Sequence, residues 1–232
     1  MPDYKNKHGE NWVTSDESAL SDLRKENFWK TLEHFVPISS VPFPKGHKVV
    51  ILDVGCGECE EGAVLNAYFG SHRFGQASHK AKVIGIDSDA ESIKTAVRRH
   101  RLLGSGLKKP PFAVPTYQFI LGNAAEMGDS PLIPGRVDVV LMRHQFVKQD
   151  YFSGDRNWAL VLGECLKKMD KASILIITSF SDDENKLLMK LLSTLEVSVE
   201  VNALNPHRIS LRYDYIEKDV AIDRFVTVVR IK

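Results

Sequence analysis

The chain of 232 residues has few cysteines, no long apolar run and almost no net charge. Its three cysteines, Cys56, Cys59 and Cys165, are too few for the disulfide framework of a small secreted domain. No apolar run reaches the ~18 residues that a membrane-spanning helix needs, so we expect no membrane partner. The formal net charge of +1 gives no argument for nucleic acid as a partner.

The N-terminal segment is polar and sets the expected domain organisation. Residues 1–18 lack the apolar core of a secretory signal, so we expect a cytoplasmic protein. Apolar residues recur at helical spacing near residues 27–36, and prolines follow at once. We therefore expect an N-terminal extension at 1–45, with a helix near 27–36, and a single main domain at 46–232.

Apolar strands alternate with helical segments along the main domain. The expected strands are 49–54, 82–87, 117–121, 137–142, 172–180, 197–203 and 224–231. Helices between successive strands imply a parallel sheet covered on both faces. Residues 205–223 show no helical period, so the last two strands are expected to pair antiparallel. The fold class is therefore α/β: a doubly wound, mostly parallel seven-stranded sheet with an antiparallel C-terminal strand.

The first strand runs into a glycine turn, Asp53-Val54-Gly55-Cys56-Gly57. Glycine allows positive φ angles at a sharp strand-to-helix turn and leaves room for a ligand against the backbone. The helix that follows points its positive end into the cleft. Any tight turn can use glycine, so Gly55 and Gly57 alone identify no ligand.

Asp87, at the end of the second strand, can accept hydrogen bonds from both hydroxyls of a ribose. It could instead cap the next helix, a role that aspartate also favours. Ser88 and Asp89 offer competing caps, and Ser88 and Glu91 have the spacing of a capping box. We therefore favour the ligand role for Asp87.

Asp53 distinguishes between cofactors. A carboxylate beside the glycine turn repels a diphosphate and attracts a cationic amino group. The dinucleotide fingerprint G-x-G-x-x-G is also not met, because residues 58–61 include three acids and precede Gly62. These features disfavour a nicotinamide dinucleotide.

The turn resembles the first motif of the class I S-adenosylmethionine-dependent methyltransferases, an acid followed by glycines at alternate positions. The third glycine of that motif is Cys59 here. The resemblance covers residues 49–180 and implies a Rossmann-like methyltransferase fold with S-adenosyl-L-methionine as cofactor. It implies the following contacts: Gly55, Cys56 and Gly57 along the methionine moiety with Asp53 near its amino group, Asp87 on the ribose, Ser88, Asp89, Asn123 and Ala124 around the adenine, and Met142 and Arg143 beside the cofactor and facing the substrate.

Catalytic residues are not readable from the sequence, because methyl transfer requires alignment more than a protein nucleophile. His144 is a candidate general base, although a loop histidine that only forms hydrogen bonds is the preferred interpretation. The fourth strand ends without the Asn-Pro-Pro-aromatic run of the amino-directed nucleic-acid methyltransferases of this family. A small-molecule acceptor is slightly favoured over protein or RNA. A nicotinamide-dependent oxidoreductase and a non-catalytic interaction protein are the alternatives.

Three further features have a functional and a structural interpretation. The Cys56-x-x-Cys59 pair could be redox-active or bind zinc, but no second pair completes a four-thiolate site, so we expect no metal. Basic residues at 98–101, with Lys108 and Lys109, either complement a helix dipole or bind a phosphate. The aromatic residues Phe28, Trp29 and Phe35 either form a lid or, as we favour, pack into the core.

Overall fold

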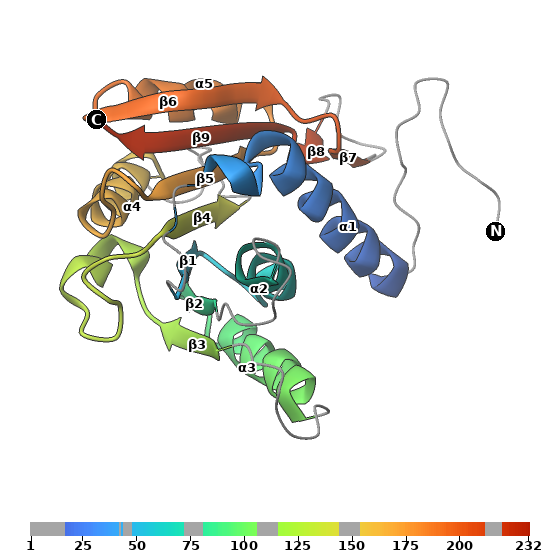
Figure 1. Ribbon diagram of the computed structural model, residues 1–232. Coiled ribbons are helices and arrows are strands. Elements are labelled where there is room, and N and C mark those ends of the chain that lie inside the picture. The colour runs from blue at the N-terminus through green and yellow to red at the C-terminus, as the bar shows by residue number, and fades with distance from the viewer. Residues whose placement is uncertain are drawn as a thin grey trace, which may run out of the picture.

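The computed structural model describes residues 17–41, 43, 48–71, 81–105, 116–143, 154–211 and 220–232 (Figure 1). The helices are α1 (Glu17–Phe35), α2 (Gly62–Ser71), α3 (Ala90–Ser105), α4 (Gly154–Lys167) and α5 (Asp182–Leu192), with the 3-10 turns η1 (Ile38–Ser40) and η2 (Ala124–Asp129). The strands are β1 (Val50–Val54), β2 (Lys82–Asp87), β3 (Thr116–Leu121), β4 (Val139–Arg143), β5 (Ile174–Ser179), β6 (Val197–Leu204), β7 (Ile209–Leu211), β8 (Val220–Ile222) and β9 (Phe225–Ile231). Within these ranges no helix combines the length and apolar character that crossing a bilayer requires.

Seven strands form one sheet in the order β3-β2-β1-β4-β5-β9-β6. The pairs from β3 to β5 are parallel, and β9 runs antiparallel to both β5 and β6. The predicted fold class, including the antiparallel C-terminal strand, is therefore confirmed. The strand order reverses at β1, between β2 and β4, and ligands of open α/β sheets bind outside the carboxyl ends of the strands at such a point.

The strands of the sheet are apolar because helices cover both of its faces. Neighbouring residues of β1 illustrate this: Ile51 packs in one core cluster and Leu52 in the other, since successive side chains of a strand point to opposite faces. The first cluster includes residues of α1, α2 and α3, and the second includes residues of α4 and α5. Figure 1 shows the same two groups of helices on either side of the sheet.

Helix α1 is longer than predicted and packs into the core. Phe28 and Leu32 have no exposed surface, and Trp29 meets Tyr68 of α2 edge to face at 5.2 Å. The Nδ2 of Asn205, after β6, donates a buried hydrogen bond of 2.9 Å to the Oγ1 of Thr31. The structure therefore agrees with core packing for the N-terminal aromatic residues, rather than with a lid.

The segment between β6 and β9 contains a short antiparallel pair, β7 and β8, that the sequence did not predict. The amide of Ala221 in β8 donates to the carbonyl of Phe180, so this pair is attached at the carboxyl end of β5. Its strands have only three residues each. Such short strands carry too little periodicity for recognition from sequence alone.

Polar side chains cap the N-termini of both α5 and α3. Ser181 caps α5, because its Oγ accepts a hydrogen bond from the Glu184 amide at 3.3 Å. The box predicted for Ser88 and Glu91 is wrong. Asp89 caps α3 instead, since its carboxylate accepts from the amides of Glu91 and Ser92, and a carboxylate at this position also complements the helix dipole.

Candidate functional site

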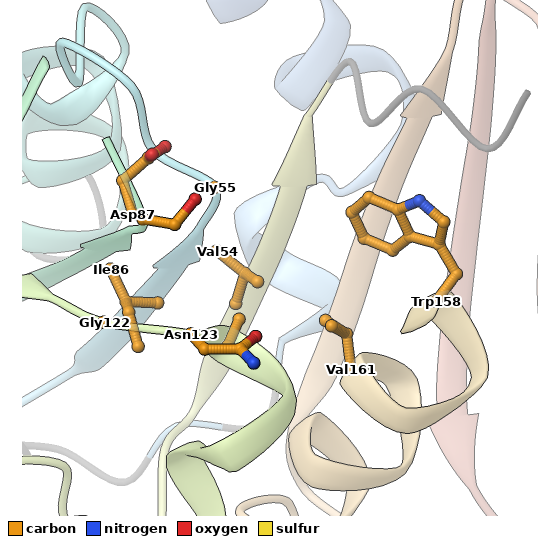
Figure 2. A pocket seen from close by; sticks show the side chains of 10 residues that line it. Val54, Gly55, Ile86, Asp87, Gly122, Asn123, Trp158 and Val161 are labelled. Carbon is orange, nitrogen blue, oxygen red and sulfur yellow. The ribbon is translucent and has the colours of Figure 1, made fainter. Parts of the chain in front are cut away.

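A cavity of about 290 Å³ lies at the carboxyl edge of the sheet (Figure 2). It is lined by Val54, Gly55, Ile86, Asp87, Ser88, Gly122, Asn123, Ala124, Trp158 and Val161. These residues come from the ends of β1, β2 and β3, from η2 and from the first turns of α4. The topology therefore gathers them where the strand order reverses.

The glycine turn after β1 has the backbone conformation that the sequence predicted. Gly55 and Gly57 have φ angles of 65° and 51°, a region in which other residues are strained. The amides of Gly55 and Cys56 donate to the carbonyl of Ile86 at 2.8 and 3.1 Å, so the turn is fixed against β2. A Cβ at Gly57 would meet no atom within 4 Å.

Asp87 connects this turn to the start of α3. Its Oδ2 accepts a hydrogen bond of 2.8 Å from the Gly57 amide, and its Oδ1 accepts one of 2.8 Å from the Asp89 amide. Each carboxylate oxygen has a second lone pair, and the residue lines the cavity. Because Asp89 provides the cap of α3, the carboxylate of Asp87 is not needed as a helix cap.

The far wall of the cavity is formed by η2 and α4. Asn123 begins η2, and its Oδ1 accepts from the Ala125 amide at 3.0 Å. Figure 2 shows Trp158 and Val161 across the cavity from Asp87. Sequence reasoning missed these two residues, because neither belongs to a motif that indicates a ligand site. The position of their helix could have indicated them, because it begins beside the carboxyl ends of the strands.

Five of the predicted site residues line the cavity together: Gly55, Asp87, Ser88, Asn123 and Ala124. Six others do not belong to the lining: Asp53, Cys56, Gly57, Asp89, Met142 and Arg143. The candidate base His144 lies outside the described residues. Met142 is buried in the core, where the Sγ of Cys165 lies 4.0 Å from its Sδ.

Asp53 points away from the cavity because strand side chains alternate. Val54 lines the cavity, whereas Asp53 is buried on the other face of β1 with 1% of its surface exposed. Its Oδ2 accepts a hydrogen bond of 3.4 Å from the Cys59 thiol. Burial, followed by the nearby Glu61, raises the pKa of Asp53 well above its ordinary value, so the protonated form is favoured.

Arg143 was predicted to face the substrate, but its guanidinium is buried in an ion pair. It donates to both carboxylate oxygens of Asp223, with its Nη2 at 2.7 Å from Oδ2, and its Nη1 lies 3.6 Å from Glu61. The guanidinium also lies 4.6 Å from the centroid of the Phe28 ring. Burial alone would lower the pKa of Arg143, but Asp223 and Glu61 raise it above its ordinary value.

Cys59 occupies the place of the third glycine with a φ of 51°. Both thiols of the Cys56-x-x-Cys59 pair are buried. The pKa of Cys59 is raised well above its ordinary value, by its hydrogen bond with Cys56, by burial and by nearby acids. A protonated, buried thiol is a poor nucleophile. In the part of the chain that the structure describes, no His, Cys, Asp and Glu side chains cluster as metal ligands.

The lining fits a nucleoside better than a diphosphate. Of the ten lining residues none is lysine or arginine, and the one charged residue is Asp87. A diphosphate needs cations or a cluster of free amides, but the Gly57 amide is already bonded to Asp87. The carboxylate of Asp87 suits the diol of a ribose. The amide side chain of Asn123 and the apolar walls suit a base.

A family model described as a methyltransferase domain matches residues 45–219. The chain belongs to this family. It is an S-adenosylmethionine-dependent methyltransferase of class I, and S-adenosyl-L-methionine is its cofactor. A comparison with curated proteins gives no significant match.

Solved structures of methyltransferases share the fold of this methyltransferase. A S-adenosylmethionine-dependent methyltransferase from Clostridium acetobutylicum has a TM-score of 0.60 at 10% identity, over 93% of this chain and 95% of that one. Magnesium protoporphyrin IX methyltransferase from Synechocystis, with bound S-adenosylmethionine, has a TM-score of 0.58 at 13% identity, over 99% of this chain and 89% of that one. An rRNA methylase from Streptococcus thermophilus has a TM-score of 0.53 at 10% identity, over 96% of this chain and 100% of that one. At these identities the likeness shows the fold alone.

Proposed function

We propose that this methyltransferase transfers the methyl group to a small molecule. The observation that carries the proposal is the charge of the cavity: among the described residues that line it there is one carboxylate and neither lysine nor arginine. A nucleic-acid acceptor requires cations along the path of its phosphates. The formal net charge of +1 supplies no general excess of them.

The proposed contacts to the donor follow from the lining. Asp87 accepts hydrogen bonds from the ribose hydroxyls, Asn123 and Ala124 lie at the base, and the Gly55 turn lies along the amino-acid part. Asp53 and Arg143 act from beneath the turn rather than by direct contact, since neither lines the cavity.

The donor supplies a methyl group that a sulfonium charge has already activated. The residues of the chain bind the donor, orient it and exclude water. Val54, Ile86 and Val161 give the cavity apolar walls, and Trp158 adds a flat aromatic surface opposite Asp87 (Figure 2). Orientation of two reactants can contribute roughly 7–11 kcal/mol to the lowering of a barrier. We therefore assign no catalytic base.

A transfer assay with donor labelled in its methyl group tests the acceptor class. A cell extract is divided by ultrafiltration into a small-molecule fraction and a macromolecular fraction, and each is incubated with the enzyme and the labelled donor. We expect label in products of the small-molecule fraction. The Asp87→Ala variant, which loses the proposed ribose contact, is the control for transfer by this enzyme.

Treatment of the macromolecular fraction with ribonuclease or protease completes the assay. Enzyme-dependent label in that fraction that becomes filterable only after ribonuclease would identify RNA as the acceptor and overturn the proposal. Release only after protease treatment would do the same in favour of a protein acceptor.

A further inference from the structure

Two cysteines belong to the turn that borders the cavity. Gly55, immediately before Cys56, lines the cavity. Gly57, immediately after it, donates its amide hydrogen to Asp87 at 2.8 Å. Cys59 takes the place of the third glycine of the motif and gives the turn a second thiol. The turn therefore joins a pair of thiols to residues that we assign to the donor.

The backbone holds the two cysteines at a spacing that permits a disulfide. The Cys59 amide donates to the Cys56 carbonyl at 2.7 Å, which closes a four-residue turn. The α-carbons at the two ends of such a turn lie less than about 7 Å apart, and disulfides join α-carbons that are about 4.4–6.8 Å apart. Closing the bond therefore requires no movement of distant parts of the chain.

The two thiols also point to the same place, beside Asp53 and Gly85. These two residues are register partners on β1 and β2. The Cys59 thiol donates to the Oδ2 of Asp53 at 3.4 Å, and a Cβ added to Gly85 would lie 2.7 Å from the Sγ of Cys56. A hydrogen bond between the thiols favours the thiolate of Cys56 and the thiol of Cys59, although burial and nearby acids raise the pKa of both overall. The sulfur atoms are therefore neighbours.

The turn lies at the surface although its thiols point inward. Gly55 and Glu58 are exposed, whereas Cys56 and Cys59 are 4% and 0% exposed. A reagent reaches the thiols only when the turn opens locally. Cys56 is the first to react, because it is nearer to solvent and its thiolate is the one that the hydrogen bond favours.

We propose that Cys56 and Cys59 form a reversible disulfide that weakens donor binding, so that oxidation switches the methyltransferase off. The oxidant is a small-molecule disulfide. Cys56 attacks one of its sulfurs and releases the first small thiol, and Cys59 then attacks the Cys56 sulfur of the mixed disulfide and releases the second. Two protein thiols become one disulfide, and the oxidant takes up both hydrogens as two thiols. The inference rests on the proposed function, because it requires the donor to bind against this turn.

The disulfide acts on the donor through Gly57, which lies between the two cysteines. Bonding brings the sulfurs from a hydrogen-bonded contact to about 2.05 Å. Because β1 is fixed in the sheet and α2 in the core, the residues of the turn absorb this movement. The bond from the Gly57 amide to Asp87 then changes its geometry. Asp87 is the proposed ribose ligand, so we expect donor affinity to fall.

Oxidation of the protein with oxidised glutathione tests whether the bond forms. We expect the number of free thiols, titrated after denaturation, to fall from three to one. Peptide mass spectrometry should find Cys56 joined to Cys59. Cys165 should stay reduced, because it is completely buried in the other core cluster.

Titration calorimetry with S-adenosylmethionine then compares the reduced and the oxidised protein. We expect the affinity to fall at least about tenfold on oxidation and to return after treatment with dithiothreitol. Cys59→Gly cannot form the bond, and glycine accepts the φ of 51° at this position. Its affinity should be the same before and after oxidation. Cys56→Ser carries the same expectation if Cys59→Gly does not fold, whereas the matched control Cys165→Ala should still lose affinity on oxidation.

Absence of the bond between Cys56 and Cys59, or formation of a mixed disulfide only, would overturn the inference. The same holds if the oxidised protein binds the donor as tightly as the reduced one, if the cysteine variants lose affinity equally on oxidation, or if circular dichroism shows that the oxidised protein has unfolded. These outcomes leave the proposed function intact. Failure of the reduced protein to bind the donor would instead contradict the proposed donor contacts, and the inference with them.

Discussion

The guanidinium of Arg143 meets the carboxylate of Asp223 at 2.7 Å, with both groups buried. The contact joins the end of β4 to the turn before β9, 80 residues away. Asp223 has a φ of 52°, a strained value that aspartate tolerates better than most residues. The ion pair thus fixes a strained turn next to the carboxyl edge of the sheet.

Replacement Asp223→Asn leaves Arg143 without its main partner. Because asparagine tolerates the same backbone conformation, the substitution removes the ion pair without adding backbone strain. We expect the free energy of unfolding in urea to drop by about 3–5 kcal/mol. The matched control is Asp182→Asn, which breaks the exposed pair with Arg224 and should cost less than about 1 kcal/mol. Equal effects of the two substitutions would contradict a stabilising role for the buried pair.

Replacement Asp53→Asn should change how stability depends on pH. The folded protein holds the proton of Asp53 more tightly than the unfolded chain does. The contribution of this group to stability is therefore full below the unfolded pKa of about 4 and is lost as the pH rises through the folded pKa. We expect the difference in unfolding free energy, variant minus wild type, to grow by up to about 1.4 kcal/mol per pH unit in that window. A difference independent of pH would show that Asp53 titrates normally.

Replacement Asp87→Ala should weaken donor binding by about 1–3 kcal/mol, because charge-assisted hydrogen bonds to the ribose are lost. Titration calorimetry measures the change. Glu91→Ala is the control, since it removes an equal charge from the exposed first turn of α3 and Glu91 does not line the cavity. Unchanged donor affinity in Asp87→Ala would remove Asp87 from the site.

Replacement Gly55→Val should abolish donor binding while leaving the sheet folded. A β-branched residue at a φ of 65° is strained by roughly 1–2 kcal/mol, and its side chain would also occupy the edge of the cavity. Circular dichroism and calorimetry separate the two effects. Gly163→Ala in α4, where a Cβ has open space, should leave binding intact and raise stability by up to about 1 kcal/mol. Retained affinity in Gly55→Val would mean that the turn does not contact the donor.

The strands of the parallel sheet were predictable because each is a short apolar run that ends in a polar or glycine-rich turn. The bounds predicted for β2 agree with the structure, and those of β1 differ by one residue. Topology followed from the alternation of strands and helices. These features are local, so they can be recognised in a single sequence.

The directions of particular side chains were not predictable. The position of Asp53 relative to the cavity depends on which face of β1 carries its side chain, and one sequence does not reveal that face. The position of Arg143 depends on Asp223, a partner in a segment whose short strands left no periodic signal. Trp158 faces the cavity because of where α4 begins, which is a property of the assembled sheet.

Because Phe28 and Leu32 are completely enclosed, α1 cannot detach without exposing the apolar interior of the domain. Its amide hydrogens between these two residues should exchange with deuterated solvent nearly as slowly as those of β1, unlike those of a loosely attached arm. Any shortened version of the chain that begins after α1 would expose an apolar surface, associate with other copies through it and precipitate.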